Sequence, residues 1–326
     1  MAQNGVQDLI RARALGYGHS QRDGLSPRIA LCVEGGGMRG IVSGGTLAAL
    51  FERNLVRCFD TIYGVSAGTF SAVYTACDRV EAGKDVYLRY LNTFNFFSVG
   101  NLLAGDLINV HYLMETVKAT LTAKDIAKLG GFSPQVRTVL YEVPKAHLMS
   151  CPLTGEYNNA MALLEASATI AGCVGMRNGG TRFIDAAPVD PTGLRTVFRD
   201  GHTHAVVLLS RPRRAKLRTH GFLEDALLGP RLRQWPPYVR KLIRDRARVH
   251  EETMIWLAGL TRHSAVFVVE PNRLVSTFEL RRTRLQSAFD MGYDAGMRAA
   301  DEWVGSGDQH VVSPLDSEGY RHRGSG

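Results

Sequence analysis

The chain has 326 residues and a formal net charge of +8, from 39 Lys and Arg residues against 31 Asp and Glu residues. Apolar residues make up 45% of the chain and charged residues 21%, which excludes a disordered, collagen-like or coiled-coil protein. No run of about eighteen uncharged apolar residues occurs, so the sequence predicts no membrane-spanning helix.

The predicted elements alternate between strand and helix. An apolar run over Arg28–Glu34 predicts a buried strand, and the apolar spacing over Gly40–Asn54 predicts a helix after it. A second strand, Phe59–Tyr63, precedes a helix over Ala67–Val80. Further strands are expected at Val136–Val143, Ala205–Ser210 and Val266–Val269, and a closing helix at Tyr293–Val304. Strands separated by helices imply a three-layer α/β/α sandwich with a mainly parallel central sheet.

One domain with two polar ends is expected. Residues 1–25 are interpreted as a polar leader without the continuous apolar core of a secretory signal, so we expect a cytoplasmic protein. Residues 26–304 form the expected domain, with a motif-bearing core in 28–210 and a basic helical part in 211–304. Residues 305–326 are rich in Gly, Ser and charged residues and are predicted to be a flexible tail.

The spacing of cysteine and histidine predicts neither a disulfide framework nor a metal site. The five Cys residues form no C-x-x-C pair, and the ten His residues show no spacing typical of metal ligands. No metal or organic cofactor is therefore expected.

A glycine-rich turn, Gly35–Gly40 (GGGMRG), follows the first predicted strand and precedes the first predicted helix. Consecutive glycines leave backbone N–H groups uncovered, and the dipole of the following helix favours negative charge there. The turn also fits the G-x-G-x-x-G pattern of dinucleotide-binding proteins, but the acid at the expected separation, Asp60, precedes its strand instead of ending it. A Walker loop is excluded, because Ile41 and Val42 stand where Lys and Ser or Thr are required. On this turn alone, a nucleotide site and a site for another anion both stay open.

A second turn, Gly64–Gly68 (GVSAG), links the second predicted strand to its helix and matches the G-x-S-x-G pattern of a nucleophile elbow. Such an elbow exposes the hydroxyl of its serine, here Ser66, whereas the plain alternative is a serine that caps a helix. Because both turns follow consecutive parallel strands, we expect Ser66 to face the N–H groups of the first turn. A nucleophile beside preorganised N–H donors is what acyl transfer requires.

Asp185, in the segment RFIDAAP, is the best candidate for the base that Ser66 needs. It ends a short apolar stretch, and two small residues and a proline follow it, which lets a carboxylate enter a crowded site. The same pattern occurs where an Asp begins a surface turn, and the local sequence does not separate the two interpretations.

Together, VEGGGMRG, GVSAG and the Asp185 segment resemble the patatin-like phospholipase family in order and spacing over roughly residues 28–209. The segment EASATIAGC, residues 165–173, is also similar to a small-residue segment of that family. The resemblance implies a Ser66–Asp185 dyad that acts on lipid or other acyl esters. It further implies an oxyanion hole formed by the N–H groups of Gly36 and Gly37 with support from the Arg39 side chain. The other motif glycines are Gly35, Gly40, Gly64 and Gly68.

The aspartate raises two chemical questions. A free Asp is a weak base at neutral pH, so the site should be dry enough to raise the pKa of Asp185. The family pattern has a glycine after the aspartate, whereas this chain has Ala186. If that glycine has a positive φ, Ala186 costs energy or shifts the carboxylate.

Alternatives stay open beside this interpretation. His202 and His204 follow Asp185 in the order of the Ser-His-Asp triad of α/β-hydrolases. An acyltransferase would use the same acyl-enzyme as a hydrolase. A nucleotide-binding oxidoreductase and a non-catalytic lipid-binding module are the alternatives from other functional classes.

Basic residues crowd Arg211–Arg218 and Arg231–Arg248. In the second segment the apolar residues fall near one helical face, so the sequence predicts an amphipathic basic helix. Such a helix can contact an anionic membrane peripherally, but a scaffold helix with a solvated basic face is favoured. No recognition motif accompanies the charge, so no nucleic acid partner is expected.

Overall fold

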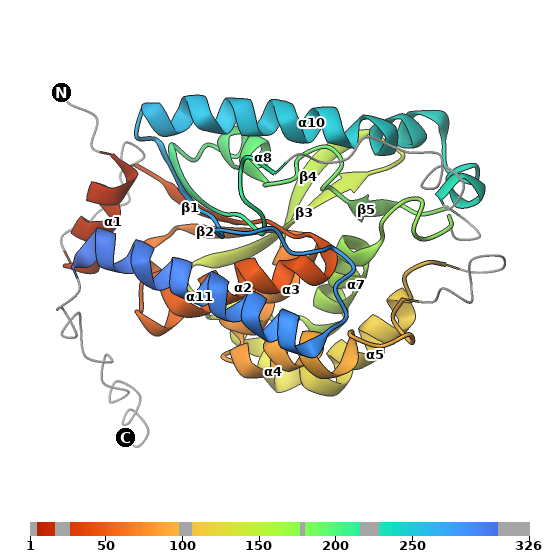
Figure 1. Ribbon diagram of the computed structural model, residues 1–326, viewed down its shortest axis with the longest axis horizontal. Coiled ribbons are helices and arrows are strands. Elements are labelled where there is room, and N and C mark those ends of the chain that lie inside the picture. Colours follow the sequence, from red (N-terminus) through yellow and green to blue (C-terminus); the bar gives the residue numbers. More distant parts are fainter. Residues whose placement is uncertain (1–4, 17–26, 98–105, 177–179, 216–227, 306–326) are drawn as a thin grey trace, which may run out of the picture.

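Five consecutive apolar residues form strand β1 (Ile29–Val33) in the middle of the sheet, and none of them is exposed. A strand that is apolar on both faces needs cover on both. The computed structural model describes residues 5–16, 27–97, 106–176, 180–215 and 228–305, and it has helices on both faces of the sheet (Figure 1). The three-layer α/β/α sandwich with a mainly parallel central sheet is confirmed.

The sheet has seven strands in the order β4-β3-β2-β1-β6-β7, with β5 paired to β3 off this path. The strands after β1 are β2 (Thr61–Val65), β3 (Gln135–Glu142), β4 (His147–Pro152), β5 (Phe183–Asp185), β6 (His204–Leu208) and β7 (Val266–Val269). The pairs β1–β2, β1–β6, β2–β3 and β6–β7 are parallel, whereas β4 and β5 run antiparallel to β3. The five strands that form the parallel pairs were predicted from the sequence. Neither antiparallel strand was, because β4 is partly exposed along its length and β5 has only three residues.

Helices α2 (Gly40–Glu52), α3 (Ala67–Ala76) and α11 (Arg282–Val304) lie on one face of the sheet, and α8 (Leu194–Arg199) and α10 (Pro237–Arg262) lie on the other (Figure 1). Further helices are α4 (Val80–Asp85), α5 (Val110–Thr120), α6 (Ala123–Ala127) and α7 (Tyr157–Ala168), with short helical turns η1 (Gly37–Arg39), η2 (Val56–Cys58), η3 (Val86–Tyr90) and η5 (Lys128–Gly130). Successive residues of β1 point to opposite faces. Leu31 therefore joins the core under α2 and α11, while Cys32 joins the core under α8 and α10.

Helix α1 (Val6–Ala14) lies within the segment that was interpreted as a polar leader. Val6, Ile10 and Ala14 are spaced four residues apart and are buried against the domain. The helix is also tied to the sheet, because Arg13 pairs with Asp60 at 2.9 Å. The apolar stripe is narrow, and charged residues surround it. The average composition of the segment is therefore polar and does not predict this buried helix. Residues 1–4 and 17–25 of the expected leader lie outside the described residues.

The C-terminal part contains helices α10 and α11 with strand β7 between them, and its last helix is longer than predicted. Helix α11 begins at Arg282, whereas the predicted closing helix began at Tyr293. Helix α10 has 26 residues and buries one stripe against the domain, so the predicted basic helix has a scaffold face. Contact of its other face with a membrane stays a prediction. Residues 216–218 of the first basic segment and the tail from 306 lie outside the described residues. Within the described ranges, no helix combines the length and the apolar character needed to cross a bilayer.

The burial of α1 predicts that Ile10→Ala destabilises the whole domain. Ile10 is fully buried, and such a truncation costs about 2–5 kcal/mol through lost contacts and the cavity left behind. Leu15→Ala is the control, because Leu15 is 49% exposed and its truncation should cost less than about 0.5 kcal/mol. Urea unfolding measures the free energy of unfolding of each variant. Equal losses in the two variants would contradict the packing of α1 against the folded domain.

Candidate active site

Strand β3 brings two distant parts of the chain together at the carboxyl edge of the sheet. The last residue of β2, Val65, is paired with Val139. Asp185 of β5 is paired with the next residue of β3, Leu140. Ser66 directly follows Val65, so the register of the sheet places Ser66 beside Asp185.

Ser66 occupies a strained turn between β2 and α3. Its φ of 53° and ψ of −128° lie outside the regions that non-glycine residues ordinarily adopt, as in a nucleophile elbow. The side chain makes no capping hydrogen bond to α3. Its hydroxyl instead lies close enough to the carboxylate of Asp185 to lower the pKa of that carboxyl group. The G-x-S-x-G turn is therefore more than a helix cap.

The two glycine turns lie in direct backbone contact. A Cβ at Gly35 would stand 2.7 Å from the Cβ of Ser66, and a Cβ at Gly68 would stand 2.0 Å from the carbonyl oxygen that ends β1. Gly40 and Gly64 approach the start of α3 equally closely. Side chains at these positions would force the turns apart.

Gly36 and Gly37 line the same cavity as Ser66. Their φ angles of 137° and 59° lie in the region that favours glycine, which turns the peptide groups away from the helical pattern. Within the part of the chain that the structure describes, neither N–H donates to a protein acceptor. Two free donors beside a nucleophile can receive a negatively charged oxygen.

Arg39 anchors this turn to segments far along the chain. Its Nε donates to the hydroxyl of Ser210 at 3.1 Å, and its Nη1 donates to the hydroxyl of Thr277 at 2.8 Å. The Ser210 hydroxyl lies 2.7 Å from the carbonyl oxygen of Gly35, and Glu34 accepts a 2.7 Å hydrogen bond from the Ser210 N–H. Sequence reasoning did not identify Ser210 or Thr277, because neither belongs to a local pattern.

Asp185 is buried, with 4% of its surface exposed. Burial raises its pKa to about 6, against the opposing effect of hydrogen bonds from the Ala187 N–H and the Ser66 hydroxyl. The Ala187 N–H donates to Oδ1 at 2.9 Å. The φ of Ala186 is not positive, so its methyl group brings no backbone strain at the position where the family has glycine. The carboxylate is thus held in place and is a stronger base than a free Asp.

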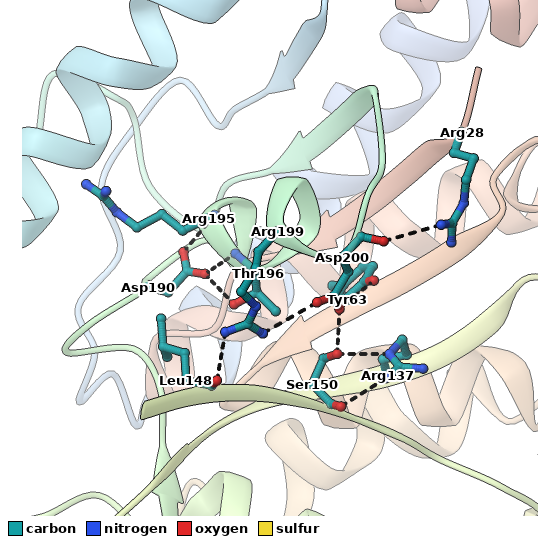
Figure 2. Close-up of polar contacts among 10 residues, drawn as sticks. All are labelled: Arg28, Tyr63, Arg137, Leu148, Ser150, Asp190, Arg195, Thr196, Arg199 and Asp200. Carbon is teal, nitrogen blue, oxygen red and sulfur yellow. Dashed lines mark hydrogen bonds and ion pairs between the residues drawn. The ribbon is translucent and has the colours of Figure 1, made fainter. Parts of the chain in front are cut away.

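Asp190 fixes the loop that follows Asp185. Figure 2 shows its carboxylate, which is fully buried, accepting hydrogen bonds from the N–H and the hydroxyl of Thr196 in α8, at 2.9 and 2.8 Å. The N–H of Asp190 donates to the carbonyl oxygen of Ala186, next to Asp185. The loop is therefore tied to α8 as well as to β5. The sequence signal that could have identified Asp190 was the position of an acidic residue shortly before a helix, because such residues bind free N–H groups of the first helical turn.

The cavity at this edge has a volume of about 660 Å³ and contains Ser66, Asp185 and the first glycine turn. Much of its wall is apolar and comes from the region of α3 to α5, including Phe70, Tyr74, Val86, Leu91, Phe97 and Leu113. A long apolar chain therefore fits against this wall. Within the described ranges, no group of three or more His, Cys, Asp or Glu side chains is placed to hold a metal ion.

The residues required by two alternative sites lie at the opposite, amino edge of the sheet. His202 and His204 lie at the start of β6, and neither lines the cavity. His202 Nε2 lies 3.2 Å from the hydroxyl of Thr61, which begins β2, and burial lowers the pKa of His202 to about 4. Asp60 accepts a 2.7 Å hydrogen bond from the N–H of Ile29, the first residue of β1. A five-residue strand spans about 16 Å, so neither a Ser-His-Asp triad nor a dinucleotide site is assembled.

Comparisons with known proteins found a matching family model and a curated relative. A family model described as patatin-like phospholipase matches residues 31–198, just over half of the chain. The uncharacterized protein YjjU of Escherichia coli K12 is 25% identical over 197 residues, which are 57% of this chain and 52% of that protein. The chain thus spans about half the length of this curated relative.

Solved structures with a partly similar trace include VipD and a human phospholipase A2. VipD from Legionella pneumophila has a TM-score of 0.44 and 12% identity, with 85% of this chain and 67% of that chain covered. The human GIVD cytosolic phospholipase A2 has a TM-score of 0.30 and 16% identity, with 46% of this chain and 26% of that chain covered.

The geometry predicts that Ser66 reacts selectively with a fluorophosphonate probe. A serine in a strained turn beside a buried carboxylate is an activated nucleophile, whereas an ordinary serine is not. Ser71→Ala is the matched control, because Ser71 lines the same cavity without contacting Asp185. Mass spectrometry should find the adduct on Ser66 in wild type and in the control, and no adduct in Ser66→Ala. Labelling that persists without Ser66 would contradict the assignment.

Proposed function

Because the chain belongs to the patatin-like phospholipase family, we propose that it hydrolyses carboxylic esters of lipids through an acyl-enzyme formed on Ser66. The observation that carries this proposal is that the Ser66 hydroxyl lies beside the buried carboxylate of Asp185, close enough to lower the pKa of that carboxyl group. Gly36 and Gly37 line the same cavity, and their N–H groups have no acceptor among the described residues, which supports the proposal further.

In the first half of the reaction, ionised Asp185 accepts the hydroxyl proton while Ser66 Oγ attacks the ester carbonyl carbon. The negative charge that develops on the carbonyl oxygen is stabilised by the N–H groups of Gly36 and Gly37, and the Arg39 cation adds a favourable field. The carbon–oxygen bond of the ester then breaks, and the leaving alcohol takes the proton from Asp185. An acyl group is left on Ser66.

In the second half, water replaces the alcohol. Asp185 accepts a proton from the water as its oxygen attacks the acyl carbon, and the same donors hold the second oxyanion. The bond to Ser66 Oγ breaks, the proton returns to that oxygen, and the fatty acid leaves. One carboxylate acts as base and acid in turn, so no histidine is needed.

The apolar wall of the cavity suits the acyl part of a lipid. Aromatic and aliphatic side chains from the region of α3 to α5 reach into the cavity that holds Ser66. Each methylene that moves from water to this wall contributes about 0.8 kcal/mol of binding free energy. We therefore expect long-chain esters to be better substrates than acetate esters.

Ser66→Ala and Asp185→Asn should each lower turnover by at least roughly a thousandfold. The first variant removes the nucleophile, and the second removes the base but keeps a similar shape. A panel of p-nitrophenyl esters and phospholipids measures the loss, with His204→Ala as the control because His204 lies outside the cavity. Near-normal turnover in either dyad variant, or a comparable loss in the control, would contradict the mechanism.

The raised pKa of Asp185 predicts an acid limb in the pH profile of kcat/KM near pH 6. Asp185 must be ionised to accept the Ser66 proton, so the rate should fall about tenfold for each pH unit below that pKa. Circular dichroism at each pH separates titration from unfolding. A rate that stays flat down to pH 4 in the folded protein would exclude Asp185 as the base.

A further inference from the structure

A second cavity lies between the sheet and the end of α8, and the proposed reaction makes no use of it. It has a volume of about 620 Å³, and none of its lining residues lines the active-site cavity. Its walls come from the first halves of β2 and β3, from β4, from the end of α8 and from Arg28 before β1. A ligand in this cavity would be separate from the ester that Ser66 attacks.

Three arginines line the second cavity, against a single carboxylate. Arg28, Arg137 and Arg199 contribute to its wall, and Asp200 is the one acidic residue among the described residues that line it. Arg199 lies 3.5 Å from the Asp200 carboxylate. Arg28 donates only to the carbonyl oxygen of Asp200, at 3.3 Å, and within the described ranges no carboxylate lies within ion-pair distance of Arg28 or Arg137. Two positive charges are therefore left without a balancing charge.

The carboxylate of Asp200 is already occupied by two hydroxyl groups. Figure 2 shows its Oδ2 accepting hydrogen bonds from the hydroxyls of Tyr63 and Ser150, at 3.0 and 2.5 Å. Tyr63 is paired with Arg137 in the register of β2 and β3, so both side chains leave the same face of the sheet. Asp200 thus holds the wall of the cavity together and neutralises little of the charge on the arginines.

Neutral oxygens fix the direction of two of the guanidinium groups. Arg137 donates from Nε and Nη2 to the hydroxyl and the carbonyl oxygen of Ser150, at 3.1 and 2.9 Å, and from Nη1 to the side chain of Gln135 at 2.9 Å. Arg199 donates from Nη1 to the carbonyl oxygen of Leu148 at 2.7 Å. These bonds orient the side chains before a ligand arrives and leave their charges in place, which lowers the entropic cost of binding an anion.

We propose that Arg28, Arg137 and Arg199 bind the phosphate group of a small soluble phosphorylated molecule; this does not rest on the proposed function. A phosphate group has about two negative charges at neutral pH, which matches the surplus in the cavity. The planar guanidinium group also fits phosphate oxygens with two parallel hydrogen bonds. None of the large apolar side chains that are exposed among the described residues lines this cavity. No such side chain there is placed to enter a bilayer, which favours a soluble ligand over a lipid headgroup.

Isothermal titration calorimetry with inorganic phosphate and with pyrophosphate, at constant ionic strength, tests the site. Arg137→Gln and Arg199→Gln should each raise the Kd at least roughly tenfold, because each removes a charge and its donors. Arg28→Gln should do the same, and Arg28 is exposed, so its replacement spares the packing of the sheet. Arg195→Gln is the matched control, because Arg195 lies over the ring of Trp256 and does not line the cavity. Thermal melting verifies that each variant is folded.

The outcomes separate a specific site from the general positive charge of the chain. Absence of binding at millimolar phosphate and pyrophosphate overturns the proposal, and so does an equal loss of affinity in the Arg195→Gln control. Flotation with phosphatidylcholine vesicles, with and without phosphatidic acid, tests the lipid headgroup. Vesicle binding that depends on phosphatidic acid and on Arg137, without binding of the soluble anions, would overturn the soluble ligand. Ser66→Ala should bind both anions as wild type does, so loss of the proposed hydrolase activity leaves this result unchanged.

Discussion

The site depends on the contact between two backbone turns at the carboxyl edge of the sheet. Parallel strands β1 and β2 lie about 4.8 Å apart, so the turns that follow them start side by side. Only the absence of a side chain at Gly35 lets the first turn reach Ser66, because a Cβ there would stand 2.7 Å from that of Ser66. The sheet therefore sets the distance between the serine and the N–H donors, and β3 sets the distance to the carboxylate in the same way.

Residues from the later part of the chain complete the site that the two glycine turns begin. Ser210 and Thr277 bind the side chain of Arg39, so the glycine turn is held by residues that lie after the segment matched by the family model. Arg211 and His250 come from the same later part and line the cavity. In this account the family segment supplies the reacting groups, and the C-terminal third holds the first glycine turn in place.

The sheet and the nucleophile turn were predictable, because strands buried on both faces show as continuous apolar runs and the glycine spacing around Ser66 is local. The position of Asp185 beside Ser66 was left open by the local sequence and favoured by the family resemblance, since it depends on the register of β3 with two strands that do not neighbour each other in sequence. The buried role of His250 was hidden, because only apolar residues marked the inner face of the basic helix, whereas that face also contains His250 and Thr253.

A crystal structure of the covalent adduct between Ser66 and a long-chain alkyl phosphonate tests the central claim most directly. The account predicts a phosphoryl oxygen about 2.7–3.1 Å from the backbone nitrogens of Gly36 and Gly37, Asp185 within hydrogen-bond reach, and the alkyl chain along the apolar wall. A phosphoryl oxygen that points to solvent, away from both glycines, would contradict it.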